Sequence, residues 1–281
     1  MSESEPDAVS WRSGTCHANG IDIHYRRTDA GKPPLVALHG LIGSGACLLP
    51  LARTLEKNFD VILPDARGHG GSSAPDRGYL YGDLAGDVLA LIEKLALPAP
   101  VLVGHSMGGM TAAVAASTSG STLTALVLID PTFISPAWQQ EVHESDIAAE
   151  HRQLLLSTRD ELITAARLRS PNRSPGLIGH LVDARLRTSP SAFEVLTPPN
   201  PDWRDLVRTL TVPTLLLIGD RGVVSLETAR ELQSLNPLLR YELIADAGHG
   251  LPYDEPARSG ATILAFLKEA ATKGDLPPKG Q

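Results

Sequence analysis

The chain has 281 residues, of which 42% are hydrophobic and 20% are charged, and its formal net charge is −7. This composition is typical of a globular protein with a full apolar core, and the scattered Lys and Arg residues disfavour a nucleic-acid partner. No run approaches the roughly 20 apolar residues that span a membrane, and the chain starts with acidic residues. We therefore expect a cytoplasmic protein with no membrane partner.

The two cysteines, Cys16 and Cys47, have neither the spacing of a disulfide framework nor that of a zinc site. We expect two free thiols and no metal site. The length favours one large domain that carries an insertion over two independent domains.

The first predicted element is a hairpin over residues 14–27, where Asn19-Gly20 supplies the positive φ angles of a tight turn. Apolar runs that are too short for helices then recur, which is typical of buried parallel strands. They are residues 35–38, 61–63, 101–103, 126–129 and 215–218. Apolar residues at helical spacing over 83–95 and a small apolar face over 110–116 predict helices between them. This alternation predicts an α/β fold with a doubly wound, mostly parallel sheet.

The strand pattern stops between residues 132 and 211. Helical patterns separated by Pro and Gly replace it, over 138–156, 160–168, 176–186 and 192–210. We interpret residues 132–211 as a helical cap inserted after the sixth strand, with residues 1–131 and 212–281 forming the core. An extended segment over 240–244 and a helix over 258–269 complete the core.

A candidate nucleophile lies in the sequence Gly104-His105-Ser106-Met107-Gly108, a G-x-S-x-G motif between an apolar strand and a helix of small residues. Glycines on both sides allow a sharp strand-to-helix turn that exposes the Ser106 hydroxyl. A glycine-rich packing turn is the alternative interpretation, but the strand and helix around the motif favour the nucleophile.

A serine nucleophile needs a base, and His249 is the best placed of the nine histidines. It follows the last predicted strand, and a loop at the carboxyl end of such a strand faces the same crevice as Ser106. The histidines at 143, 151 and 180 lie on predicted cap helices, and His69 is expected to structure a loop.

Two backbone amides are candidates for an oxyanion hole, the pair of donors that a tetrahedral intermediate requires. Met107 begins the helix after the nucleophile, where amide groups and the helix dipole favour an anion. Leu41 lies in the loop after His39-Gly40, which follows a buried strand. We expect the His39 ring to hold this loop.

Four motifs together resemble the α/β-hydrolase superfamily, from about residue 20 to residue 267. They are His39-Gly40, Arg67-Gly68-His69-Gly70-x-Ser72, Gly104-His105-Ser106-Met107-Gly108-Gly109 and Gly248-His249. The resemblance implies an acyl-transfer site with Ser106 and His249 as nucleophile and base, Leu41 and Met107 as oxyanion donors, and no cofactor. It also implies a cap at the position of the predicted insertion.

A third residue, an acid that orients the base, completes the Ser-His-acid triad of this superfamily. Its position departs here from the usual pattern, in which an Asp follows the seventh strand as G-x-x-D. Gly222 stands where that Asp would fall. The candidates are Asp130, at the end of the sixth strand as in some members of the superfamily, and Asp220, two positions early. Asp246 and loss of the acid are further alternatives.

The predicted activity is hydrolysis of a carboxylic ester or lactone by two-step acyl transfer, on a small-molecule substrate. Apolar residues of the cap are candidate pocket walls, with Phe133 and Trp138 put first. The others are Ile134, Leu154, Leu155, Leu177, Ile178, Phe193 and Trp203. Hydrolysis of a carbon–carbon bond or an enol-lactone is an alternative, since such enzymes share the same motifs. A receptor or scaffold without turnover is the alternative from another class, because the usual acid position is empty.

Overall fold

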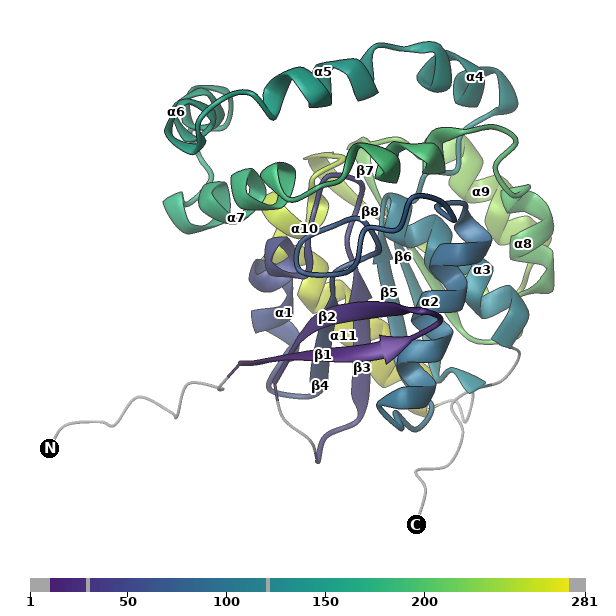
Figure 1. The fold of residues 1–281 in the computed structure, drawn as a ribbon. Helices are drawn as coiled ribbons and strands as arrows, with labels where there is room; N and C mark the ends of the chain where they lie inside the picture. Colours follow the sequence, from purple (N-terminus) through teal and green to yellow (C-terminus); the bar gives the residue numbers. More distant parts are fainter. Residues whose placement is uncertain (1–10, 29–30, 120–121, 273–281) are drawn as a thin grey trace, which may run out of the picture.

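An eight-stranded sheet forms the centre of the computed structural model, which describes residues 11–28, 31–119 and 122–272 (Figure 1). Its strands are β1 (Arg12–Ala18), β2 (Ile21–Arg27), β3 (Pro34–Leu38), β4 (Asp60–Pro64), β5 (Val101–His105), β6 (Ala125–Ile129), β7 (Thr214–Arg221) and β8 (Leu239–Gly248). The spatial order is β1-β2-β4-β3-β5-β6-β7-β8. β1 and β2 are antiparallel, as is the pair β2 and β4, and all other neighbours are parallel. The predicted fold class, including the antiparallel start at Asn19-Gly20, is confirmed.

Helices cover both faces of the sheet because its strands are apolar on both sides. α1 (Leu49–Leu55) and α11 (Pro256–Thr272) cover one face, and α2 (Tyr81–Lys94), α3 (Met107–Ser119) and α9 (Leu226–Leu235) cover the other. Residues of β3 alternate between the two cores, with Leu35 and Ala37 on the α1 side and Val36 and Leu38 on the α3 side. The central strands β3, β4, β5 and β6 are therefore buried at every residue, which explains their short unbroken apolar runs.

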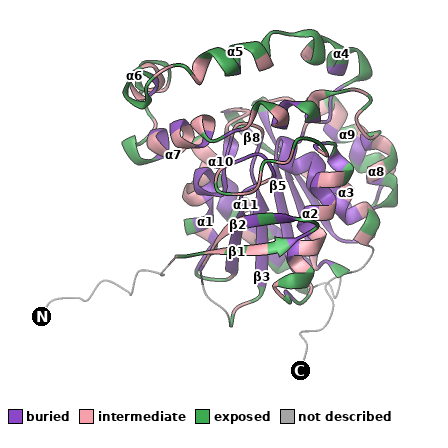
Figure 2. Ribbon diagram, viewed as in Figure 1, coloured by how far each residue is buried: buried purple, intermediate pink, exposed green. Residues whose placement is uncertain are grey.

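The segment between β6 and β7 is helical, as predicted. It contains α4 (Pro136–Glu144), α5 (Ile147–Leu154), α6 (Arg159–Arg169), α7 (Pro175–Leu186), a 3₁₀ helix (Pro190–Leu196) and α8 (Trp203–Thr209). The predicted helix over 138–156 is interrupted at Ser145, whose φ and ψ are extended. Helices α4 to α7 lie above one end of the sheet (Figure 1), and α4 and α5 are largely exposed while the central strands are buried (Figure 2).

The last helix of this segment belongs to the core. Trp203 and Val207 of α8 are buried in the cluster that α3 and the sheet form. Trp203 also stacks on Phe133, with ring centroids 5.8 Å apart. The inserted layer above the sheet is thus shorter than the predicted range 132–211, because both ends of that range pack into the core.

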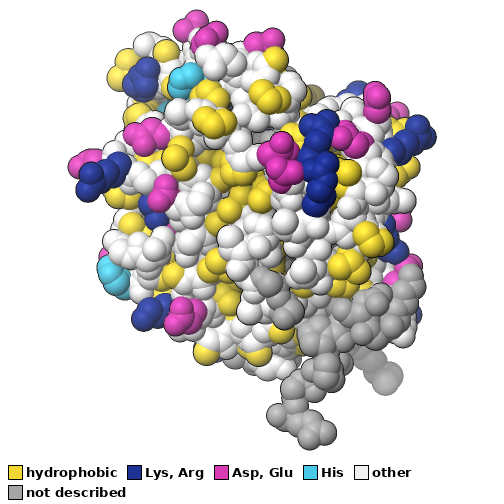
Figure 3. Space-filling model, turned by 90° about the vertical axis from the view of Figure 1, so that its right-hand side faces the viewer, with side chains coloured by type: hydrophobic (Ala, Val, Ile, Leu, Met, Phe, Trp, Pro, Cys, Tyr) yellow, Lys and Arg dark blue, Asp and Glu magenta, His cyan; other side chains and the backbone are white. Residues whose placement is uncertain are grey.

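No helix within the described ranges is long and apolar enough to cross a membrane. On the face shown in Figure 3, basic side chains are spread out and most lie beside acidic ones. Cys16 and Cys47 are free cysteines, as expected.

Candidate active site

Ser106 lies at the turn between β5 and α3, at the end of the sheet that the inserted helices cover. Its φ of 56° is in the left-handed region, a strained conformation that costs roughly 1–3 kcal/mol for a non-glycine residue. The surrounding hydrogen bonds hold it there: the Ser106 amide donates to the Ile129 carbonyl at 3.1 Å, and its carbonyl accepts from the amides of Gly109 and Met110. The turn thus presents the hydroxyl as the G-x-S-x-G motif predicts.

His249 meets Ser106 across the end of the sheet. Its Nε2 is 2.9 Å from Ser106 Oγ, and its Nδ1 is 2.6 Å from Asp130 Oδ2. A carboxylate only accepts, so Nδ1–H donates to Asp130 and the Nε2 lone pair accepts from the Ser106 hydroxyl. The three side chains form one hydrogen-bonded chain in the order required for proton transfer from serine.

Asp130 is fully buried at the end of β6, with a positive φ of 39°. Besides His249, its carboxylate accepts from the amides of Val223, at 2.8 and 3.0 Å, and Val224, at 2.9 Å. These donors compensate for the removal of a charge from water.

Gly222 makes room for this carboxylate. A Cβ at position 222 would lie 2.7 Å from both Asp130 carboxylate oxygens, closer than real Cβ atoms approach. A side chain at position 222 and the Asp130 carboxylate would therefore compete for the same volume, and glycine leaves that volume to the carboxylate.

Asp220 has a different role in the structure. Its carboxylate accepts from the amides of Asp246 and Ala247, both at 3.0 Å, and so bridges β7 to β8 where their pairing is irregular. The structure brings Asp130, and not Asp220, to His249.

His105 lies behind His249 and was not singled out in the sequence. Its Nε2 donates to the His249 carbonyl at 2.8 Å, and Tyr253 Oη lies 3.3 Å from its Nδ1. Burial lowers the pKa of His105 to about 3, so the ring is neutral and fixed as the Nε2–H tautomer. The position directly before Ser106 in the motif was the available signal.

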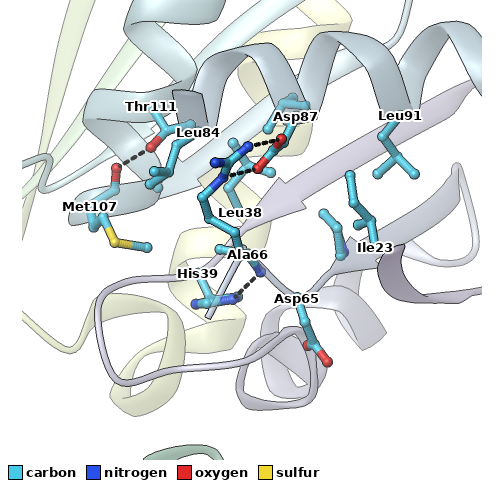
Figure 4. Close-up of a pocket in the computed structure, with 14 residues that line it drawn as sticks. Ile23, Leu38, His39, Asp65, Ala66, Leu84, Asp87, Leu91, Met107 and Thr111 are labelled. Carbon is cyan, nitrogen blue, oxygen red and sulfur yellow. Dashed lines mark hydrogen bonds and ion pairs between the residues drawn. The ribbon is translucent and has the colours of Figure 1, made fainter. Parts of the chain in front are cut away.

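His39 holds the loop that contains Leu41, as expected. Its Nδ1 donates to the Gly40 carbonyl at 2.8 Å, and its Nε2 accepts from the Ala66 amide at 3.0 Å (Figure 4). Burial lowers the pKa of His39, which keeps the ring neutral for this pair of bonds. A Cβ at Gly40 would lie only 3.1 Å from Ser106 Cβ, so the loop passes directly beside the serine.

A cavity of about 330 Å³ opens next to Ser106, between the sheet and the inserted helices. Ser106, His249 and Leu41 line it from the core. From the insertion, α5, α6 and α7 contribute apolar side chains, namely Leu154, Leu162, Ile178 and Val182. The volume suits a small-molecule ligand.

Phe133 and Trp138 are not among the residues that line this cavity, whereas Leu154 and Ile178, two other candidate walls, are. Phe133 is buried against Trp203 in the core, and Trp138 is 41% exposed on α4. The structure thus corrects both predictions, because α5 to α7 lie over Ser106 and α4 does not line the cavity.

A second cavity of about 30 Å³ lies behind His39 and Met107 (Figure 4). It is too small for a substrate and has room for about one water molecule. The buried ion pair between Arg67 and Asp87, at 2.5 and 2.6 Å, closes one side of it. Across residues 11–28, 31–119 and 122–272, no cluster of three or more His, Cys, Asp or Glu side chains could hold a metal ion.

Known proteins share this fold. A family model described as the alpha/beta hydrolase fold matches residues 33–256. The sequence is 26% identical to N-formylmaleamate deformylase from Pseudomonas putida, covering 86% of this chain and 91% of the relative. It is 39% identical to an sn-1-specific diacylglycerol lipase from Xenopus tropicalis, covering 89% of this chain and 83% of the relative.

Solved structures agree with the sequence relatives. The crystal structure of E-2-(acetamidomethylene)succinate hydrolase superposes with a TM-score of 0.78 at 24% identity, over 92% of this chain and all of that one. The sequence relatives are hydrolases, which supports hydrolase activity here. The chain belongs to the alpha/beta hydrolase fold family.

Proposed function

We propose that the chain is a serine hydrolase that cleaves a carboxylic ester or lactone by two-step acyl transfer. The observation that carries this proposal is the hydrogen-bonded chain of Ser106, His249 and Asp130 beside a cavity of substrate size. A receptor or scaffold would not need three buried or half-buried polar groups aligned in this order.

In the first step Ser106 Oγ attacks the acyl carbon while His249 Nε2 takes the hydroxyl proton. Asp130 stays ionised, orients the imidazole ring and stabilises its positive charge. The same proton then passes from His249 to the leaving oxygen. In the second step His249 deprotonates a water molecule, which attacks the acyl-enzyme and releases the acid and Ser106.

Two amides serve as the proposed oxyanion donors. Met107 is the first residue of α3, so its amide has no partner within the helix. Leu41 lines the cavity in the loop that His39 holds against Ala66. Fixed donors of this kind stabilise the charge that develops on the carbonyl oxygen.

The inserted helices α4 to α7 form a cap in this proposal, of which α5 to α7 close the cavity over Ser106. They separate the reacting atoms from bulk water and supply the walls that select a substrate. The proposed reaction uses the side chains and backbone amides of the protein together with water.

An activity-based probe tests the proposal. Wild-type protein should be labelled by a fluorophosphonate at Ser106 and should hydrolyse p-nitrophenyl butyrate. Ser106→Ala should remove the label and lower kcat/KM by about 10⁴-fold or more, because the nucleophile is lost. Ser117→Ala, on the helix that follows Ser106 and outside the cavity, is the matched control. Retention of label and turnover in Ser106→Ala would contradict the proposal.

A further inference from the structure

Three arginines line the cavity beside Ser106, and none of the residues that line it is Asp or Glu. They are Arg169 at the end of α6, Arg173 in the turn after it, and Arg185 on α7. The cavity wall that the insertion contributes is therefore strongly positive, in a protein whose net charge is negative.

One of the three arginines is already neutralised by the core. Arg173 forms a two-pronged ion pair with Asp254 of α10 (Leu251–Asp254), with distances of 2.7 and 2.9 Å. This bond ties the insertion to the segment that follows His249. Arg173 thus has a structural role, and the Asp254 carboxylate compensates its charge.

Arg169 and Arg185 have no ion pair or side-chain hydrogen bond to any residue within the described ranges. Arg185 is half-buried, and both its burial and the neighbouring charge of Arg169 lower its pKa. Arg169 itself is exposed. A half-buried guanidinium that a neighbouring cation repels is unfavourable unless a negative group joins it. The protein supplies no such group at Arg185, and an anion that enters the cavity would supply it.

The guanidinium group also narrows the kind of anion. Its planar fork of N–H donors matches two oxygens of a carboxylate or a phosphate, and it keeps its charge at any physiological pH. Apolar side chains line the same cavity, with Leu162, Ile178 and Val182 among them. The cavity thus combines a reactive serine, an apolar wall and a pair of free cations.

We infer that the substrate carries an anionic oxygen group, a carboxylate or a phosphate, which Arg169 and Arg185 bind while Ser106 attacks the acyl carbon. This inference rests on the proposed serine hydrolase activity and names its substrate class. Arg169 and Arg185 are then specificity-determining residues.

Anion binding is tested first, without turnover, by calorimetry on Ser106→Ala protein with succinate and with inorganic phosphate. The additional change Arg185→Gln or Arg169→Gln should weaken binding of the preferred anion by about tenfold or more, the size of a charged hydrogen bond. Arg167→Gln, an exposed residue of α6 outside the cavity, should change it by less than about twofold. The anion that binds more tightly identifies the group; binding of neither overturns the inference.

Turnover then compares two substrates of the same length, methyl butyrate and monomethyl succinate, by titration of the acid released. Arg185→Gln should lower kcat/KM for monomethyl succinate by about tenfold or more and for methyl butyrate by less than about twofold. Equal losses on both esters would overturn the inference. If phosphate binds more tightly than succinate, phosphate should inhibit hydrolysis of methyl butyrate by the wild type. Arg185→Gln should then weaken this inhibition by about tenfold or more.

The two proposals fail in different ways. Suppose that Ser106→Ala abolishes hydrolysis of methyl butyrate but the arginine variants leave anion binding and turnover unchanged. The proposed serine hydrolase activity is then supported, and the inferred anion site is contradicted. If hydrolysis persists in Ser106→Ala while anions still bind through Arg185, the proposed serine hydrolase activity is contradicted. The inference that the anion is part of a substrate is then contradicted as well.

Discussion

The two walls of the cavity differ in how completely the protein satisfies their polar groups. At the strand ends, Ser106, His249 and Asp130 bond to one another, and Asp130 also has two backbone partners. On the inserted helices, Arg169 and Arg185 have no such partner within the described chain. The reacting groups are preorganised by the fold, whereas the opposite wall is completed only by a ligand.

This difference follows from where each wall is built. The reacting groups are held by turns that end buried parallel strands, where neighbouring backbone amides are fixed by the sheet. Arg169 projects from α6, which is largely exposed, and Arg185 projects from α7, which is largely half-buried (Figure 2). A rigid edge suits bond-making steps, and a more exposed helical wall suits the selection of substrates.

The preorganised wall should break when a single methyl group is added at Gly222. Gly222→Ala places a Cβ 2.7 Å from the Asp130 oxygens, so the carboxylate must move away from His249. We expect kcat/KM for p-nitrophenyl butyrate to fall by about tenfold or more, because orientation of the base is lost. Gly82→Ala on α2 is the control, since a Cβ there meets nothing within 4 Å. Unchanged activity in Gly222→Ala would mean that the acid tolerates displacement.

The buried histidine His69, which lies against the His39 ring, should make stability depend on pH. Burial lowers the pKa of His69 to about 3, whereas in the unfolded chain it is near 6.5. Between these values the unfolded state binds the extra proton, so stability is present above pH 6.5 and falls as pH decreases.

We expect His69 to account for about 2 kcal/mol of the stability lost between pH 7 and pH 5. His69→Asn retains a donor near the Arg67 carbonyl, which His69 Nδ1 contacts at 2.8 Å, but it does not titrate. Urea unfolding at both pH values should show a smaller loss in the variant. The same loss in both proteins would contradict a neutral, buried His69.

The smallest effect is expected at the outer helix of the insertion. Trp138 is 41% exposed and does not line the cavity, so Trp138→Ala should change kcat/KM by less than about twofold. The measurement uses the ester that gives the highest wild-type rate. A tenfold loss would instead place α4 on the path of the substrate.

The strands and the turn at Ser106 could be predicted because their signals are local. An unbroken apolar run ending in G-x-S-x-G specifies both the buried strand and its sharp exit. Helix α9 could have been predicted in the same way. Its apolar residues have helical spacing after Ser225, whose side chain caps the helix; they are Leu226, Ala229, Leu232 and Leu235. This helix was not among the predicted elements.

The acid and the substrate wall depend on contacts between distant segments. Asp130 and Asp220 both lie near the ends of neighbouring parallel strands, so chain order alone could not choose between them. In the structure β7 continues through Arg221, so Asp220 lies within the strand and accepts hydrogen bonds from two amides of β8. Asp130 is therefore the carboxylate left to contact His249. Arg169 and Arg185 come from different helices, and no local pattern places them in one cavity.

The assignment of Asp130 as the acid is tested most directly by comparing Asp130→Asn with Asp220→Asn in ester hydrolysis, with folding checked by circular dichroism. We expect Asp130→Asn to lower kcat by roughly 10³–10⁴-fold, because the imidazole loses its orienting carboxylate, and Asp220→Asn to lower it by less than about tenfold. A larger loss in folded Asp220→Asn protein, or near wild-type activity in Asp130→Asn, would contradict the triad of Ser106, His249 and Asp130.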